Sequence, residues 1–161
     1  MKQKLWVNIF FGITLCFGVG YIASMATQMS VSTWYKALEK PFFTPPSWIF
    51  APVWSLLYFL MGIALGRAIF VINRDKLDKN GLYYFVGQLL FNGLWSVFFF
   101  GLKNPALGLL TIIFLLFLIK QTIKYLRAID KLSAQILYPY FFWVIFAALL
   151  NFSIVYLNYK Q

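Results

Sequence analysis

Three tryptophans are the residues of this chain best suited to chemistry, because they stand inside apolar segments and not at their ends. Trp54, Trp95 and Trp143 each lie one or two helical turns within such a segment. Tryptophans at the ends of membrane helices usually occupy the membrane interface, which does not explain these three. An indole stacks on flat aromatic molecules and donates a hydrogen bond. The three residues therefore indicate either core packing or a ligand cavity.

A stripe of polar side chains accompanies these indoles. Tyr84, Gln88, Asn92 and Ser96 follow at steps of four residues, so they share one helix face. Polar groups that face lipid cost free energy, and the stripe should therefore face the protein interior. There Asn92 or Ser96 could accept a hydrogen bond from a buried indole. Interhelical hydrogen bonds, at about 0.6 kcal/mol each, would equally explain these amides and a further deep amide, Asn151.

Several kinds of chemistry are excluded by composition. The chain has no histidine and a single cysteine, Cys16, so histidine-bound metal or haem, serine–histidine catalysis and an intramolecular disulfide are ruled out. Its four acidic residues all lie outside the long apolar segments, which argues against a carboxylate proton relay or a cation pump. We therefore expect neither a metal nor a cofactor.

The apolar segments themselves predict the fold class. Of the 161 residues, 62% are hydrophobic and 11% charged, which excludes a water-soluble globule and a disordered chain. A membrane-spanning helix needs about 20 predominantly apolar residues. We predict an all-α membrane protein, a five-transmembrane-helix bundle in a single domain, 1–161. The predicted spans are 5–26, 48–72, 82–100, 105–124 and 133–156. A β-barrel would need alternating polar and apolar residues, which runs such as 111–119 lack.

The basic residues predict how the helices cross the membrane. With five spans, the N-terminal side carries eight of them and the other side four: Lys2, Lys4, Arg74, Lys76, Lys79, Lys124, Arg127 and Lys131 against Lys36, Lys40, Lys103 and Lys160. Arg67 and Lys120 fall inside predicted helices, and Lys120 should lie near a membrane face because its span is short. The positive-inside rule then predicts a cytoplasmic N-terminus and an outside C-terminus. A cleaved signal peptide is the alternative reading of the first span, although its apolar region exceeds the usual length.

The net charge of +10 does not indicate nucleic-acid binding, because the charges collect in short loops between spans. The first loop, 27–47, is unusually long and rich in aromatic residues, which argues for order. Ser32 or Thr33 could cap a short helix there, which Pro41 would end. We predict a lid over the outer mouth of the bundle. The alternative is a segment that only rests in the membrane interface.

The loop residues 34–46, WYKALEKPFFTPP, closely resemble the signature of the translocator protein or TspO/MBR family. Further matches follow along nearly the whole chain: Pro52–Trp54 with Tyr58, Asn92–Ser96 with Phe98–Phe100, and Pro139–Tyr140 with Trp143, Phe146–Ala147 and Asn151. The resemblance implies a five-helix bundle, commonly a homodimer, in which the first loop covers a pocket. Candidate dimer contacts are the strips Gly12–Gly20 and Gly62–Gly66.

The resemblance also implies a function. The family binds porphyrins, notably protoporphyrin IX, and synthetic isoquinoline carboxamide and benzodiazepine ligands, which predicts a sensor or carrier. An alternative is light- and oxygen-dependent porphyrin degradation, as in some bacterial members, with Trp54 and Trp143 as the reactive residues. A second alternative is a regulatory partner of another membrane protein. In each case the residues carried over to the pocket are Tyr35, Pro45, Phe50, Trp54, Tyr58, Asn92, Trp95, Ser96, Phe99, Trp143, Ala147 and Leu150.

Some details depart from the family pattern. Thr111 stands where some members have an acidic residue, and Phe99 replaces a smaller polar residue of some relatives, which would shrink the pocket. The sterol motif near the C-terminus is only loosely present, with Leu150, Tyr156 and Lys160 in place. Lys36 and Lys40 could meet porphyrin propionates at the mouth. Alternatively, they form a solvated loop face, since exposed ion pairs contribute little.

Overall fold

The long apolar segments form long helices in a computed structural model, which describes residues 2–159. The elements are α1 (Lys2–Gln28), α2 (Trp34–Ala37), α3 (Ser47–Asp75), α4 (Asn80–Ser96), the π-helix η1 (Val97–Gly101), α5 (Pro105–Ile129), α6 (Lys131–Ile136) and α7 (Tyr138–Asn158). Five segments are long and apolar enough to cross a membrane: α1, α3, α4 with η1, α5, and α6 with α7. The predicted fold class is thereby confirmed. Lys160 lies outside the described residues.

Prolines mark where these helices begin. α3 starts directly after two prolines, and α5 starts at Pro105, where the Asn104 side chain accepts a hydrogen bond from the Leu107 N–H at 3.0 Å. The last span is divided at Leu137, next to Pro139 at the start of α7. α5 continues to Ile129 and is longer than the predicted span 105–124. Lys120 therefore lies more than two turns before the end of its helix.

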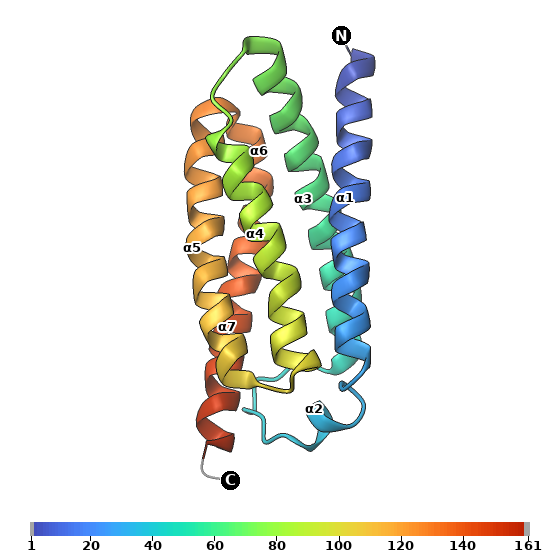
Figure 1. Ribbon diagram of the computed structural model, residues 1–161, viewed down its shortest axis with the longest axis vertical. Helices are drawn as coiled ribbons and strands as arrows, with labels where there is room; N and C mark the ends of the chain where they lie inside the picture. The colour runs from blue at the N-terminus through green and yellow to red at the C-terminus, as the bar shows by residue number, and fades with distance from the viewer. Residues whose placement is uncertain (1, 160–161) are drawn as a thin grey trace.

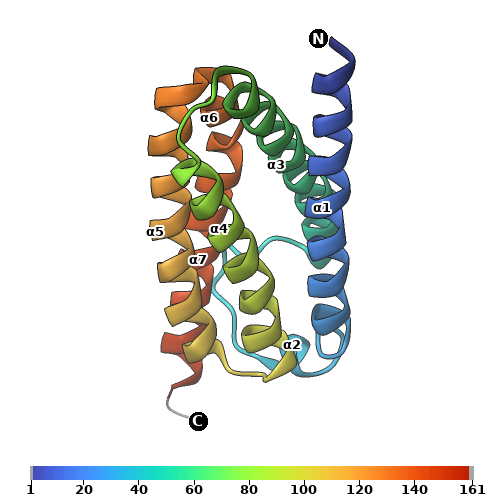
Figure 2. The ribbon, with the colours of Figure 1, turned by 45° about the horizontal axis from the view of Figure 1, so that its top comes forward.

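The helices form a ring in which each packs against its neighbours. α1 contacts α3 and α4, α4 contacts α5, α5 contacts α7, and α6 and α7 complete the ring against α3. Figure 1 shows the start of α1 and α6 at one end of the bundle, and α2 with the end of α7 at the other. The view in Figure 2 agrees, with the connection between α1 and α3 crossing the end that α2 occupies. This connection is the predicted lid.

Glycines bring α1 and α3 into backbone contact. A methyl group at Gly12 would collide with the carbonyl oxygen of Gly62, and one at Gly66 would collide with the backbone of Ile9. A methyl group at Gly62 would lie 2.6 Å from the backbone nitrogen of Ile13. Small residues permit this close approach in membrane helices. These glycines therefore pack helices within one chain, so they do not mark a dimer contact.

An ion pair joins the two halves of the ring at the end away from the lid. The Arg67 guanidinium on α3 donates to both carboxylate oxygens of Asp130, at 3.1 and 3.3 Å. Burial alone would raise the pKa of Asp130, but hydrogen bonds from Ser133 and the charge of Arg67 outweigh it, so the pKa of this carboxyl lies below its usual range. Arg67, which falls inside a membrane span, is thus neutralised by a partner from the α5–α6 corner.

Candidate ligand-binding site

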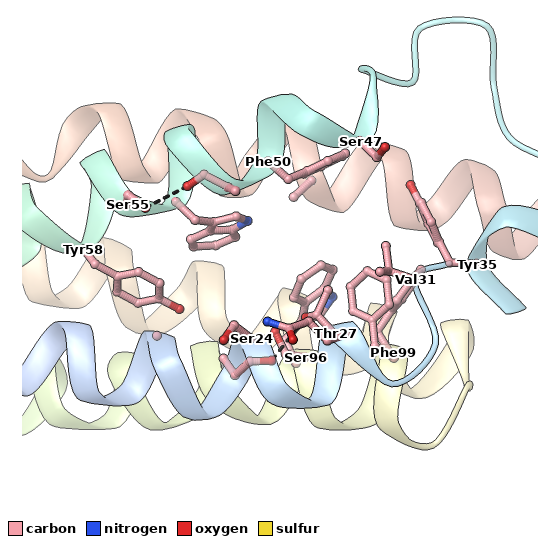
Figure 3. A pocket seen from close by; sticks show the side chains of 18 of the residues that line it. Ser24, Thr27, Val31, Tyr35, Ser47, Phe50, Ser55, Tyr58, Ser96 and Phe99 are labelled. Atoms are coloured by element: carbon pink, nitrogen blue, oxygen red, sulfur yellow. Dashed lines mark hydrogen bonds between the residues drawn. The ribbon is translucent and has the colours of Figure 1, made fainter. Parts of the chain in front are cut away.

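A cavity of about 440 Å³ lies between the helices at the lid end of the bundle. Figure 3 shows Tyr58 at one end of the cavity and Tyr35 at the other, with Phe50 on α3 and Ser24 on α1 between them. The volume falls in the usual range for small-molecule sites, about 300–1,000 Å³. Away from the lid, the bundle is filled by fully buried side chains such as Met61 and Phe85. The aromatic cavity is therefore confined to the lid half of the bundle.

Most residues that the sequence singled out meet at this cavity. Ten of the twelve line it: Tyr35, Phe50, Trp54, Tyr58, Trp95, Ser96, Phe99, Trp143, Ala147 and Leu150. They come from α2, α3, α4, η1 and α7, so the fold gathers positions that are far apart in the chain. That they bind a ligand remains a prediction.

Two predicted residues do not line the cavity. Asn92 lies behind Tyr58: it accepts a hydrogen bond from the Tyr58 hydroxyl at 2.5 Å and donates to the Tyr140 hydroxyl at 3.2 Å. Its amide is therefore engaged in the core and is not presented to a ligand. Pro45 stands in the second half of the lid, where Phe43 turns to pack against Phe146 of α7 at a ring distance of 6.3 Å. The inner face of the lid is formed earlier, by Val31 and Tyr35.

The π-helix η1 shapes one wall of the cavity. Its wider turn, closed by the hydrogen bond from the Leu102 N–H to the Val97 carbonyl at 2.8 Å, turns both Phe99 and Phe100 inward. Phe99 stacks on Trp95 at 5.4 Å and fits against Gly108, where an added methyl group would come within 2.9 Å of its ring. The large Phe99 is thus accommodated by a glycine on α5.

The indoles of the cavity wall differ in whether their N–H groups have a hydrogen-bond partner. The Trp95 N–H donates to the Asn151 side chain at 3.1 Å, so the expected partners Asn92 and Ser96 are replaced by an amide from α7. The Trp143 N–H, in contrast, is buried and has no partner within residues 2–159. The same holds for both polar atoms of the Gln88 amide, so interhelical hydrogen bonding explains Asn151 but not Gln88. Trp143 lines the cavity, and its N–H is a donor that no described residue uses.

The lid is attached to η1 through Ser30 and Tyr35 and to α7 through Phe43. The buried hydroxyl of Ser30 donates to the Phe100 carbonyl at 2.7 Å, and the Tyr35 ring packs on those of Phe99 and Phe100. The short predicted helix is present as α2, and Thr33 precedes it but forms no side-chain cap. α2 ends at Ala37, well before Pro41. The lid closes the cavity at the end of the bundle.

The described charged side chains lie outside the cavity. Burial raises the pKa of Tyr35 to about 12, so its phenol stays neutral. The Lys40 ammonium donates to the carbonyls of Lys36 and Leu38, at 3.1 and 2.8 Å, and lies 5.0 Å from the Tyr35 ring centre. Desolvation lowers the pKa of Lys40. Lys40 thus caps α2, and among the described residues no lysine, arginine or carboxylate lines the cavity.

We expect Asn158→Ala to loosen the lid. The Asn158 amide accepts from the Glu39 N–H at 3.1 Å and donates to the Glu39 carbonyl at 2.9 Å, which fixes the lid to α7. Each such bond contributes about 1 kcal/mol. Because both bonds are lost, at about 2 kcal/mol together, hydrogen exchange should accelerate about 30-fold in peptides that cover 38–44, with no change in the 76–79 loop. Equal exchange at 38–44 in both proteins would show that other contacts fix the lid.

The sequence interpretation missed the contribution of α1. Several further lining residues come from its C-terminal half, from the lid and from the start of α3: Phe17, Gly20, Tyr21, Ala23, Ser24, Thr27 and Gln28 on α1, Val31 in the lid, and Ser47, Ala51 and Ser55 on α3. Tyr21, Ala51 and Ser55 are exposed, so the cavity opens between these two helices. A usable signal was present, because small residues repeat at helical spacing at 20, 24 and 27 and again at 47, 51 and 55.

Fold and site together define an integral membrane protein, an all-α bundle with a lidded aromatic cavity. Comparison with known proteins gives its family. The model of the TspO/MBR family matches residues 12–157. The chain is 47% identical to the tryptophan-rich protein TspO of Archaeoglobus fulgidus, over 87% of this chain and 90% of that one. It is 30% identical to the tryptophan-rich sensory protein of Cereibacter sphaeroides, over 92% of both.

A mammalian relative is also similar to this chain. The translocator protein of Bos taurus is 30% identical, over 83% of this chain and 79% of that one. These matches cover most of each protein. The chain belongs to the TspO/MBR family, whose members carry the names of sensory and translocator proteins.

Proposed function

We propose that this protein binds a flat, hydrophobic tetrapyrrole such as protoporphyrin IX in the cavity and acts as a membrane sensor or carrier. Synthetic ligands of the isoquinoline carboxamide and benzodiazepine classes would occupy the same space. The names of its relatives support a sensor or carrier, and the aromatic wall supports the class of ligand. A macrocycle can stack on indole and phenyl rings, which favour offset or edge-to-face contacts.

The observation that carries this proposal is the unpartnered indole N–H of Trp143. Phe50 packs against this indole at 6.1 Å, and Ala147 and Asn151 continue the same face of α7 along the cavity. A buried donor without a partner costs free energy, which a ligand with an acceptor nitrogen or carbonyl would recover. The uncharged lining favours a neutral macrocycle core, with any propionates outside the cavity. Metal-free porphyrin should bind better than haem, because no histidine can act as an axial ligand.

The proposed orientation places the N-terminus in the cytoplasm and the lid outside. It rests on the excess of basic residues at the end of the bundle opposite the lid. We further propose a homodimer. Because Gly12, Gly62 and Gly66 are used between α1 and α3, the dimer contact must involve other surfaces.

Trp143→Phe tests the binding proposal. The substitution keeps an aromatic ring but removes the donor, and the donor has no partner in the free protein. We therefore expect the affinity for protoporphyrin IX in the dark to fall about five- to tenfold, with the melting temperature unchanged. Trp48→Phe is the matched control, because Trp48 is 72% exposed and does not line the cavity. Equal affinities for the two variants would contradict the proposed role of Trp143.

Light-dependent degradation of the porphyrin is the alternative function. Its support is that Trp54 and Trp143, the two predicted reactive indoles, both line the cavity. In this case oxygen is the oxidant and the pigment absorbs the light. Illumination should bleach bound protoporphyrin IX faster than a protein-free sample, and Trp54→Phe should abolish the difference while binding persists. If the protein instead regulates another membrane protein, bleaching in the presence of the wild type and of Trp54→Phe should both equal that of the protein-free sample.

A further inference from the structure

A second hollow lies at the end of the bundle opposite the lid. It has a volume of about 580 Å³ and is formed by the last turns of α5, by Lys131 at the start of α6, and by the first turn of α7. Its polar lining consists of Lys120, Lys124, Arg127, Lys131 and the Tyr138 side chain, and its apolar lining includes Ile123 and Phe141. We name this hollow the basic groove. It is separate from the lidded cavity and shares no residue with it.

The four basic side chains of the groove lie on successive turns and form one cluster of positive charge. Lys120, Lys124 and Arg127 are spaced by four and three residues, so they share one face of α5, and Lys131 follows four residues later. Within residues 2–159 none of the four forms an ion pair. The carboxylate next in sequence, Asp130, is engaged by Arg67 and by the Ser133 hydroxyl. The groove therefore carries positive charge that the described residues do not neutralise.

The depth of Lys120 points to a membrane ligand. It precedes the end of α5 by nine residues, about 13 Å along the helix axis, and lies within a candidate membrane span. Orientation by the positive-inside rule accounts for cations in and beside loops, but not for one at this depth. A charge inside a membrane segment usually has a partner or marks a binding site. Lys120 can snorkel toward the headgroup layer, where Lys124 and Arg127 also lie.

We propose that the basic groove binds the phosphate headgroup of an anionic phospholipid from the leaflet at this end of the bundle. The cations would hold the phosphate, and the apolar floor at Ile123 and Phe141 would contact the start of the acyl chains. Basic pockets between membrane helices bind anionic headgroups in this way. Phe117, which is exposed and lies one turn before Lys120 on α5, would continue the path for the chains.

Native mass spectrometry of the purified protein in detergent tests this proposal. The probe is an equimolar mixture of dioleoyl phosphatidylglycerol and dioleoyl phosphatidylcholine. Each basic residue near a membrane surface contributes about a factor of five to anionic lipid binding. The wild type should retain phosphatidylglycerol preferentially, and the double variant Lys120→Gln with Lys124→Gln should reduce that preference about 25-fold. The double variant Lys4→Gln with Lys79→Gln is the control. Lys4 lies at the start of α1 and Lys79 directly precedes α4, and both helices begin at this end of the bundle (Figure 1), but neither lysine lines the groove.

Three results would overturn the proposal. The first is equal retention of both lipids by the wild type, which requires no variant. The second is an equal loss of preference in the control variant, which would indicate general surface charge. The third is displacement of phosphatidylglycerol by inorganic phosphate at the same concentration, which would indicate a site for a free anion. If the glutamine variant fails to fold, Lys120→Arg with Lys124→Arg replaces it, and this variant should keep the preference.

Discussion

Gly62→Ala should lower the melting temperature of the protein in detergent by about 5–10 °C. The new methyl group would lie 2.6 Å from the backbone nitrogen of Ile13 and 2.8 Å from its side chain. A backbone atom cannot rotate away as a side chain can, so α1 must move off α3. Such overpacking typically costs about 1–3 kcal/mol, and in a protein of this size each kcal/mol shifts the melting temperature by about 2–4 °C.

Gly18→Ala provides the matched control on α1. Gly18 is exposed on the lipid side, and a methyl group there would meet nothing within 4 Å. Alanine also favours a helix more than glycine does. The melting temperature of this variant should equal or slightly exceed that of the wild type. If Gly62→Ala and Gly18→Ala have the same melting temperature, α1 and α3 are not in backbone contact and the packing described above is wrong.

Ala147→Phe should abolish ligand binding without unfolding the protein. Ala147 lies on the cavity wall, one turn after Trp143 and one turn before Asn151. A phenyl ring placed there would enter the empty space of about 440 Å³, so it meets fewer packed atoms than a ring inserted into a filled core. We expect the affinity for protoporphyrin IX to fall at least about 100-fold, which is about 2.7 kcal/mol.

Leu149→Phe separates blocking of the cavity from a general effect on α7. Leu149 is 57% exposed on the same helix, and its substitution adds a ring of the same size on the lipid side. Its affinity and melting temperature should match those of the wild type. Unchanged affinity in Ala147→Phe, with a normal melting temperature, would place the ligand outside the cavity.

The fold could be predicted because its determinants are local. Charge-free segments of sufficient length specify membrane helices, and prolines directly before α3 and at the first residue of α5 mark where these two helices begin. The pairing of helices was harder to predict. The Gly62–Gly66 strip permits close contact with any smooth helix surface, and only the structure shows that its partner is α1. The partnership of Arg67 with Asp130 joins residues 63 positions apart and has no local signal.

The aromatic part of the site was predictable, but its hydrogen bonding was not. Ten of the twelve residues that the family resemblance implied line the cavity, and their binding of a ligand stays a prediction. Asn92 faces the bundle interior as the polar stripe predicts, but Tyr58 stands between it and the cavity. The π-helix, whose hydrogen bonds cannot be derived from spacing alone, turns Phe100 inward beside Phe99. The α1 wall was missed because small residues in a membrane helix indicate contact more often than a cavity.

The central claim is that the lidded cavity binds a tetrapyrrole, and a dark titration of the purified wild-type protein with protoporphyrin IX tests it most directly. Tryptophan fluorescence and porphyrin absorbance are followed together. We predict saturable quenching at one porphyrin per chain, reversed by an isoquinoline carboxamide ligand that competes for the same space. Quenching that rises linearly without saturation, or that the competitor leaves unchanged, would contradict the claim.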